Sequence, residues 1–321
     1  MPALAHHSPA SYDLHKSVSV TGKVVRYEWA NPHVYIFLEQ SGSAGPIGWQ
    51  VECSPPAILR RVGWSQHTLR AGDVVTVTGS PSKNPARRSL LAISIQHGGV
   101  TLFDRKLELE QLQSPQSAQA IPGSGLDGVF ATLIAPKALD ELEEPGKLAL
   151  TPEGSAAFKR FDEKQMNPGA NCVAFAAPLS MVAPDTKRIT SGKGFIRIEG
   201  DFDGAQRMIH MDSATHEGVQ PSIQGHSIGR WDGRTLVIDT AGFAYHSLGN
   251  AYGLPSGVKK HLIERLTPNP DGKSLSYHFE LTDPEYLAAP VTGEVNWVYR
   301  PDLRYAPTKC NLETARRYIG S

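Results

Sequence analysis

Short apolar or alternating segments, separated by turn residues, dominate the second half of this sequence. From residue 194 onward six such segments fit β-strands, and Gly, Asp, Asn and Pro divide them. Two of the dividers, residues 201–204 and 269–272, are typical of hairpin turns. Six meandering strands favour a closed or nearly closed antiparallel β-barrel of the lipocalin type, with a sandwich as the alternative. The expected strands are Phe195–Glu199, Gln206–Met211, Thr235–Thr240, Val258–Leu266, Leu275–Leu281 and Glu294–Tyr299.

The first part of the chain predicts a second, smaller barrel. Five strand-like segments lie between residues 17 and 97, and a short helix or turn at Ile58–Gly63 separates the third from the fourth. This number and order of elements is typical of an OB-like barrel. The expected strands are Val18–Glu28, His33–Glu39, Ile47–Cys53, Val74–Gly79 and Ser89–Gln96.

A polar segment without periodicity separates the two β-rich regions. It reads QLQSPQSAQAIPGSG, contains Pro and Gly, and is the best candidate for a linker. We therefore expect a mainly β protein with an OB-like domain at residues 1–110, a linker at 111–125 and a larger barrel at 126–321. One short helix is expected after Thr151, because Thr is a good N-cap and Pro152 fits the first helical position.

Charge and hydropathy exclude several classes of protein. Thirty-two basic and 32 acidic residues cancel without any run of like charges, which argues against a nucleic-acid-binding surface. No apolar stretch approaches the roughly 18 residues of a membrane span. An apolar content of 40% and a mean hydropathy of −0.29 describe a soluble globular protein with material for a core.

Of the three cysteines, Cys172 and Cys310 are the most plausible pair for one disulfide, with Cys53 as a free thiol.

The N-terminus contains an export signature. Ala3-Leu4-Ala5 fits the A-x-A pattern of signal peptidase, and His6-His7-Ser8 follows at once, without the charged and apolar parts of a signal peptide. We expect that the chain starts just before a cleavage site. An ordinary frayed N-terminus is the alternative.

Several separated motifs in roughly the first hundred residues resemble an uncharacterised family of exported bacterial domains. Precursors in that family carry a signal peptide that ends just before His-His-Ser, so the resemblance implies a periplasmic or secreted protein and no particular activity. The second half is similar to hypothetical exported bacterial proteins with GHSIGRW and LVIDT blocks, again without a reaction. The N-terminal motifs are His6-His7-Ser8, Gly22-Lys23-Val24-Val25, Glu28-Trp29-Ala30-Asn31-Pro32-His33 and Gly72-Asp73-Val74-Val75-Thr76-Val77-Thr78-Gly79.

Glu264 is the first candidate for chemistry. In Val258–Leu266 a period of two places Glu264 between two leucines on one face, with His261 and Arg265 on the other. If the leucine face points inward, Glu264 is a carboxylate in an apolar lining. Burial then raises its pKa, as suits a general acid or base near neutral pH. The alternative is that the Arg265 face points inward and Glu264 is solvated.

His226 is the second candidate. It lies between two glycines, in an expected loop that leads to the turn at residues 230–233. Together with His210, Asp212 and His216 it would form a cluster at one barrel mouth, since loops on a rigid barrel often carry function. The alternative is that Asp212 lies in a turn and His226 bonds only to the backbone.

Further positions complete the prediction for the second barrel. Asp239, in an otherwise apolar strand, faces the lumen or pairs with an arginine, and His246 lies in a Gly- and Tyr-rich loop that is a candidate lid. The predicted catalytic residues are Glu264, His226, Asp239 and His216. The predicted ligand-binding residues are Asp212, His246, Trp231 and Tyr277.

A metal site is predicted separately at the N-terminus. If cleavage follows Ala5, His6 offers both an amine and an imidazole to one ion, with His7 adjacent and His33 as a further imidazole. Such a nitrogen set suits copper. The alternative is that His6 and His7 are disordered terminal residues.

The leading hypothesis is an exported two-domain β protein whose second barrel holds a small, largely apolar ligand. The expected chemistry is acid–base catalysis of the lyase, hydratase or isomerase kind, which requires no cofactor. The sequence contains no HExxH or phosphate-loop motif. It contains the strings GxSxG at residues 225–229 and GxGxxG at residues 123–128, but neither lies between an expected strand and an expected helix, as a serine-hydrolase or dinucleotide site requires. The alternatives are a non-catalytic periplasmic binder of copper or another ligand, and an interaction module of the cell envelope. The oligomeric state is open.

Overall fold

The protein consists of two compact units. The computed structural model describes residues 11–115, 118–123, 125–133, 142, 145–202 and 204–319. Unit 1 comprises Ala3–Leu112 together with Thr308–Ser321, and unit 2 comprises Gln113–Pro307. The final segment therefore belongs to unit 1, whereas the sequence placed everything from residue 126 to the end in the second domain.

Unit 1 is a six-stranded sheet that closes on itself. Its strand order is β3-β2-β1-β4-β5-β6, and a parallel pairing of β3 with β5 completes a small barrel. All five expected strands are present, and β6 is an addition that the sequence did not predict. The strands are β1 (Val18–Glu28), β2 (Tyr35–Gln40), β3 (Ile47–Glu52), β4 (Val74–Pro81), β5 (Ser89–His97) and β6 (Val100–Asp104); the helices are α1 (Pro56–Arg61), α2 (Arg105–Gln113) and α7 (Leu312–Ile319).

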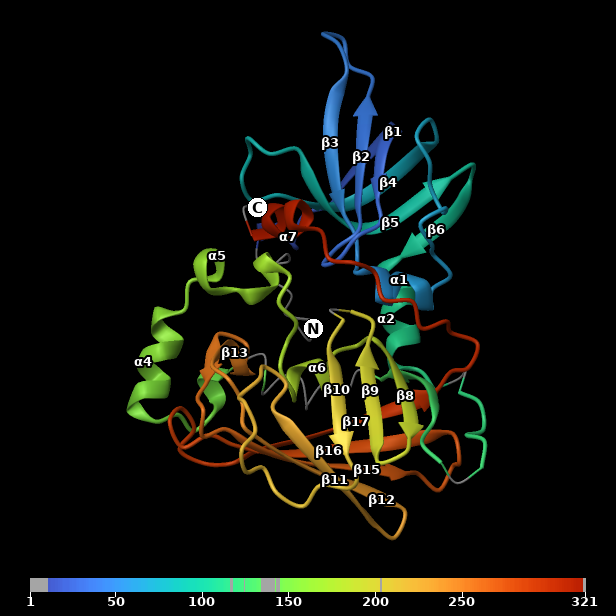
Figure 1. Cartoon of the computed structure of the whole chain (residues 1–321). Helices are drawn as coiled ribbons and strands as arrows, with labels where there is room; N and C mark the ends of the chain where they lie inside the picture. The colour runs from blue at the N-terminus through green and yellow to red at the C-terminus, as the bar shows by residue number, and fades with distance from the viewer. Residues whose placement is uncertain are drawn as a thin grey trace. The chain divides into compact units, whose positions relative to one another are not determined.

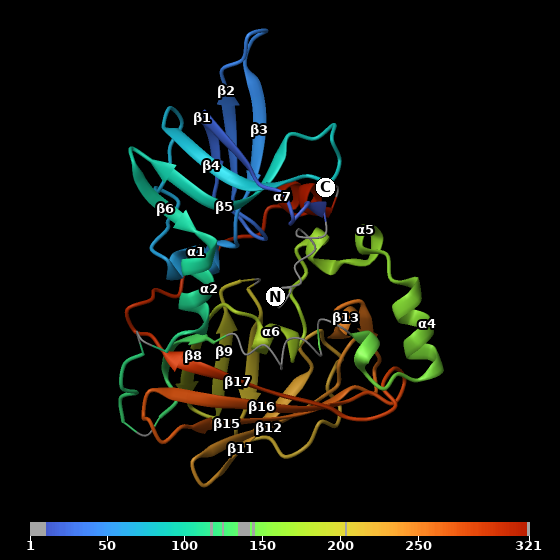
Figure 2. The ribbon, with the colours of Figure 1, turned by 180° about the vertical axis from the view of Figure 1, so that it is seen from behind.

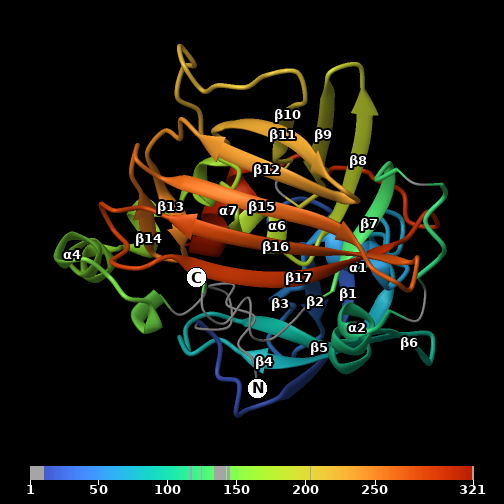
Figure 3. The ribbon, with the colours of Figure 1, turned by 90° about the horizontal axis from the view of Figure 1, so that it is seen from below.

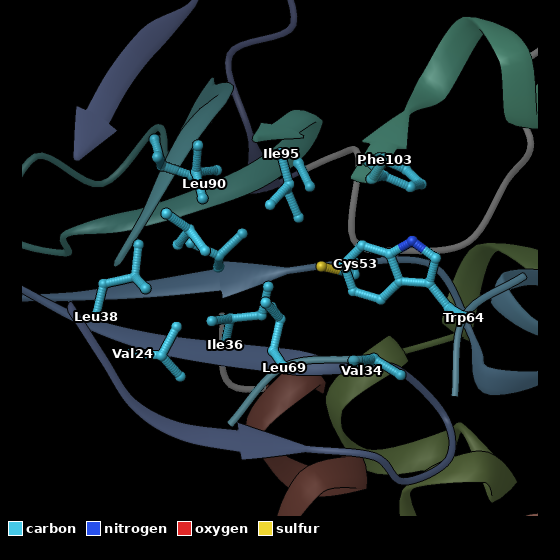
Figure 4. Close-up of a cluster of buried hydrophobic side chains, with 14 of the residues drawn as sticks. Val24, Val34, Ile36, Leu38, Cys53, Trp64, Leu69, Leu90, Ile95 and Phe103 are labelled. Carbon is cyan, nitrogen blue, oxygen red and sulfur yellow. The ribbon is translucent and has the colours of Figure 1, made fainter. Parts of the chain in front are cut away.

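The core of unit 1 is an apolar cluster. Side chains from β1, β2, β3, β4 and β5 meet there, and Trp64 and Phe103 close it with an edge-to-face ring contact at 6.0 Å between centroids (Figure 4). α7 packs within the same unit, because Arg317 pairs with Glu28 at 2.5 Å and lies over the ring of Phe37. Cys53 is a free thiol in this core, while Cys172 and Cys310 are disulfide-bonded.

Unit 2 is built around a closed barrel of nine strands. Their order is β10-β11-β12-β15-β16-β17-β7-β8-β9, and β12, β15, β16 and β17 lie side by side in Figure 3. Eight of the nine pairings are antiparallel, but β10 and β11 pair in parallel, so the expected all-antiparallel barrel needs this correction. The strands are β7 (Gly128–Thr132), β8 (Thr186–Gly192), β9 (Phe195–Gly200), β10 (Gln206–His210), β11 (His226–Asp232), β12 (Thr235–Ala241), β15 (His261–Pro268), β16 (Ser274–Thr282) and β17 (Val291–Tyr299).

The segment around His226 is a strand and not the expected loop. β11 pairs with β12 from His226 opposite Ala241 to Asp232 opposite Thr235, and Gly233 turns the hairpin with a positive φ of 58°. Gly229 is needed in this strand because a Cβ atom there would collide with the side chain of Ile209. Of the two glycines that suggested a loop, Gly229 therefore serves close packing of neighbouring strands, whereas Gly225 lies just before the strand with a positive φ of 68°.

Short helices and a two-stranded sheet complete unit 2. α4 begins after Thr151, whose hydroxyl accepts a hydrogen bond from Gly154 N at 2.9 Å, so the predicted cap is confirmed. Figures 1 and 2 both place α4 beside β13. His246 begins that strand and does not lie in a loop. The remaining elements are β13 (His246–Ala251), β14 (Leu254–Ser256), α4 (Pro152–Arg160), α5 (Glu163–Met166), α6 (Leu179–Val182) and the 3-10 turns η2 (Pro145–Lys147) and η3 (Pro168–Asn171). In the described residues no helix has the length and apolarity to cross a membrane.

Candidate functional site

The strands β10, β11, β12 and β15 carry polar side chains on both of their faces. Ser227 pairs with Thr240, and Thr240 pairs with Leu262, and all three are buried in the interior. Because side chains alternate along a strand, His226 and Asp239 point away from the barrel axis. The same strands therefore hold one polar group inside the barrel and another outside it.

The interior group is centred on an ion pair between Arg207 and Glu264. Arg207 Nη1 donates to Glu264 Oε1 and Nη2 to Oε2, both at 2.6 Å, in the two-pronged geometry that makes Arg–carboxylate pairs strong. Arg207 Nη2 also donates to Ser227 and Thr240 at 3.0 Å, and the Tyr277 hydroxyl donates to Glu264 Oε1 at 2.8 Å. We call these five residues the interior network.

Burial sets the electrostatics of this network. Arg207 is 3% exposed, and Glu264 and Tyr277 are fully buried. Burial opposes the charge of Arg207, but the paired Glu264 outweighs it and raises the Arg207 pKa. Burial raises the pKa of Tyr277 well above its ordinary value, and the Glu264 carboxylate adds to the shift. Tyr277 is therefore a neutral donor. The charges of the network are those of Arg207 and Glu264, which compensate each other.

Two hydrogen-bond donors beside the network have no acceptor. Tyr277 stacks on Trp297, with 5.2 Å between ring centroids and 9° between planes. Within the described part of the chain, the Nε atom of Arg207 and the Nε1 atom of Trp297 are buried without a hydrogen-bond partner. Most buried polar atoms in proteins have a partner, so each of these unpaired donors calls for an explanation.

Lys260 is a second buried cation in this interior. Its Nζ donates to the carbonyl oxygens of Ala177 (2.5 Å) and Gly249, and lies 4.5 Å from the ring centroid of Phe243. Burial, together with the charge of Arg207, lowers the pKa of Lys260 to about 7, although Asp283 and Glu264 oppose the shift. Lys260 therefore carries a substantial fraction of neutral amine near neutral pH.

The exterior group combines histidines with Asp239. His216 Nδ1 lies 2.9 Å from His226 Nδ1, and His216 Nε2 lies 3.1 Å from Asp239 Oδ1. His261 Nε2 reaches the same Asp239 oxygen at 2.8 Å, and the ring of His210 stacks on His226 with 4.8 Å between centroids. We call these five residues the exterior cluster.

The exterior cluster is partly exposed. The side chains of His216, His261 and Asp239 are 25%, 43% and 47% exposed. Partial burial lowers the pKa of His226, and the neighbouring His210 and His216 lower it further, so His226 is held in the neutral form. Neutral imidazole is the form that accepts a proton or binds a metal.

The predicted catalytic residues thus divide between two places. Glu264 lies inside the barrel, as expected if the leucine face points inward. His226, His216 and Asp239 are brought together on the outer face, so they share no cavity with Glu264. The sequence suggested that Asp239 faces the lumen or pairs with an arginine. Instead, Asp239 lies on the outer face and bonds to His216 and His261.

The predicted ligand-binding residues also separate. Tyr277 belongs to the interior network. His246 is buried, with Nε2 3.1 Å from the Ala174 carbonyl and Nδ1 accepting from Leu248 N at 3.1 Å. Trp231 is 48% exposed near the β11–β12 turn, and Asp212 is exposed beside Gly194.

Sequence reasoning missed Arg207, Lys260 and His261. The alternation of exposed and buried positions in Gln206–His210 puts Arg207 on the same face as Ile209. The sequence therefore indicated that Arg207 shares a face with Ile209. A charged residue in such a position is usually taken to lie at the end of a strand, where it reaches solvent. Lys260 lies within the expected strand Val258–Leu266, on the same face as Leu262 and Glu264 by period two, so its signal was also present although β15 begins only at His261.

The predicted N-terminal metal site is described only in part. His6 and His7 lie outside the described residues. His33 is buried in unit 1, with Nδ1 2.9 Å from the Cys53 carbonyl and 3.3 Å from Glu52 Oε1. A metal ligand role for His33 therefore requires its other ring nitrogen.

Comparisons with known proteins cover only part of the chain. Residues 1–91 match a family described as a family of unknown function, DUF6152. No curated protein matches the chain. Solved structures similar to part of it include the mitochondrial single-stranded DNA binding protein Rim1 of S. cerevisiae, at 12% identity and a TM-score of 0.21, covering 26% of this chain and 93% of that one.

Two further similar structures are complexes of Stn1 and Ten1. The S. pombe complex is 17% identical with a TM-score of 0.21, over 30% of this chain and 65% of that one. The yeast complex is 15% identical with a TM-score of 0.19, over 30% and 47%. Likenesses at this level carry no argument about function, and the match of residues 1–91 places the first part of the chain with an uncharacterised family.

Proposed function

We propose that unit 2 is a small-molecule-binding barrel and that the ligand lies against the interior network. The observation that carries the proposal is the pair of unpaired buried donors, Arg207 Nε and Trp297 Nε1. A buried donor without an acceptor costs about 1–3 kcal/mol. An acceptor oxygen of a ligand beside either donor would offset that donor's cost.

The surroundings define the class of ligand. The stacked rings of Tyr277 and Trp297 supply flat apolar surface, and the two donors favour a carbonyl or carboxylate oxygen. Ligand sites usually combine an apolar lining with a few placed polar groups. We therefore assign the site to a largely apolar, flat molecule that carries one such oxygen.

The contacts of Glu264 favour a positioning role. Both of its oxygens accept hydrogen bonds from Arg207, and Oε1 accepts a third from Tyr277. These bonds occupy the lone pairs that a general base would offer to a substrate. Glu264 thus holds Arg207 in place for the ligand.

Acid–base chemistry of the lyase, hydratase or isomerase kind is the extension of this proposal. Lys260 is the group best suited to it, because its pKa of about 7 lies near the pH at which a general base operates. Lys260 would exchange a proton with the ligand, while Arg207 would hold the ligand oxygen.

We also propose that unit 1 is OB-like, that unit 2 is lipocalin-like and that the protein is exported. The helix between β3 and β4 and the closure of β3 on β5 support the OB-like description of unit 1. Closure of nine strands supports the lipocalin-like description of unit 2. Export to the periplasm or out of the cell rests on the motifs of the first hundred residues.

A thermal-shift panel with native mass spectrometry tests the binding proposal. Full-length protein is incubated with benzoate, cinnamate and their uncharged amides. We expect at least one panel compound to bind and to raise the melting temperature. Trp297→Phe removes one donor while keeping the stacked ring, and it should weaken binding at least tenfold.

The exposed Trp231→Phe change is the matched control and should leave binding unchanged. Trp297→Phe also removes ring volume at a fully buried position, so its melting temperature without ligand is measured alongside that of wild type. Absence of any adduct or shift across the panel, or equal binding by both variants, would overturn the proposal.

A further inference from the structure

We infer that the exterior cluster is a binding site for one late transition-metal ion, with copper(II) the best fit and with His216, His226 and His210 as ligands. This site is separate from the proposed ligand site, because it lies on the opposite face of the same strands. It also differs from the N-terminal histidines in both residues and position along the chain.

Hydrogen bonding fixes which nitrogen of His216 faces the metal. The Asp239 carboxylate only accepts, so His216 Nε2 and His261 Nε2 must both carry protons toward its Oδ1 atom. In neutral His216 the lone pair is then on Nδ1, which points at His226. This arrangement of carboxylate, histidine and open nitrogen is the one that orients histidine ligands in metal sites.

The spacing of the two facing nitrogens suits one metal geometry. They are 2.9 Å apart, and at present a single proton lies between them. With metal–nitrogen bonds of ~2.0 Å, this separation subtends roughly 90° at the ion, whereas a tetrahedral pair needs roughly 3.3 Å. A right angle between nitrogen ligands is typical of the square-planar or tetragonal coordination of copper(II).

His210 supplies the third nitrogen after a ring rotation. The described residues contain no group of three such side chains already set to hold a metal ion, and His210 now stacks on His226. Both rings are only half-buried, so the rotation disturbs no core packing. On binding, the proton between the two Nδ1 atoms moves through solvent to Nε2 of His226, so His226 stays neutral and its Nδ1 is free to bind the metal.

The proposal is tested by metal titration of full-length, tag-free protein. Calorimetry and electron paramagnetic resonance with copper(II) alone are done in a background of His6→Gln and His7→Gln, which removes the predicted N-terminal site. We expect one copper ion with nitrogen hyperfine structure. His216→Ala or His226→Ala should weaken binding at least 100-fold, and His210→Ala should weaken it less.

Asp239→Asn separates a metal site from an accidental pair of histidines. Loss of the carboxylate should weaken copper binding by about 10–100-fold, because outer-shell partners have effects of that size. His67→Gln, an exposed histidine of unit 1, is the matched control and should change nothing. Unchanged melting temperatures will show that the variants are folded. Copper binding that survives both His216→Ala and His226→Ala, or that is absent in the background protein, overturns the inference.

Discussion

The two barrels fill their interiors in different ways. The core cluster of unit 1 consists of apolar side chains from all six strands and from the segments between them, including Cys53 and Trp64 (Figure 4). Unit 2 surrounds the pair of Arg207 and Glu264 with hydroxyl groups and buries Lys260 nearby. An apolar core is the cheaper way to stabilise a fold, because buried charges lose hydration that pairing only partly restores. The charged interior of unit 2 therefore points to a role beyond stability, and four changes test this contrast.

The largest effect is expected from breaking the interior ion pair. Glu264→Ala leaves Arg207 buried without its partner and should lower the free energy of unfolding by about 3–5 kcal/mol. The combined change Arg207→Met with Glu264→Leu removes both charges and should be near neutral or stabilising. Chemical denaturation with hydrogen exchange in β10 and β15 measures both.

If the double variant is as unstable as Glu264→Ala, the pair is required for folding itself. The contrast between the two barrels would then lose its functional meaning. Recovery in the double variant would show that the pair contributes little net stability and is retained for another reason.

The apolar core of unit 1 should respond only to volume. Leu38→Ala, at a fully enclosed position, should lower the stability of unit 1 by about 2–5 kcal/mol, since a cavity remains. Leu38→Met keeps the volume and should cost less than about 1.5 kcal/mol. Hydrogen exchange in β1 and β2 reports the effect. Equal losses for the two changes would mean that the packing explanation is incorrect.

Lys260 should make the stability of unit 2 depend on pH above neutrality. Its pKa is about 7 in the folded protein, against an ordinary value near 10.5. Between these values the unfolded chain binds more protons, so stability rises with pH, by up to about 1.4 kcal/mol per pH unit. In Lys260→Met this rise should disappear. Denaturation at pH 7, 8 and 9 measures it, and parallel curves for both proteins would contradict the assignment.

Much of this fold follows from patterns in single segments. The five strands of unit 1, the cap at Thr151 and the inward face of Glu264 all depend on local periodicity or local hydrogen bonding, which the sequence displays directly. β11 was missed because Gly225, just before the strand, and Gly229, within it, resemble loop glycines, and only the packing of Gly229 against Ile209 explains the second.

The candidate site was harder to predict because partners come from distant segments. Arg207 meets Glu264 across 57 residues, and His216 meets Asp239 across 23. Period-two patterns give the face of a residue but not the neighbour across the barrel. The sequence therefore identified His216, His226 and Asp239 as candidates. It wrongly placed them in one site with Glu264, which lies on the opposite face of the barrel strands.

The smallest expected effect concerns His246, a buried histidine with a purely structural environment. The Nδ1 atom accepts from Leu248 N, so the neutral ring donates from Nε2 to the Ala174 carbonyl. Burial lowers its pKa to about 4, while the unfolded chain titrates near 6.5. Protonation would break the bond from Leu248 and charge a ring 4% exposed. Its contribution to stability is thus complete above pH 6.5 and declines as the pH falls toward 4.

This loss should reach about 2 kcal/mol by pH 4, allowing for partial relaxation. His246→Gln should flatten that part of the stability curve, because glutamine can both donate and accept without taking up a proton. The exposed His67→Gln should leave the curve as it is. An acid-induced decline of the same depth in wild type and His246→Gln would assign the sensitivity to other groups.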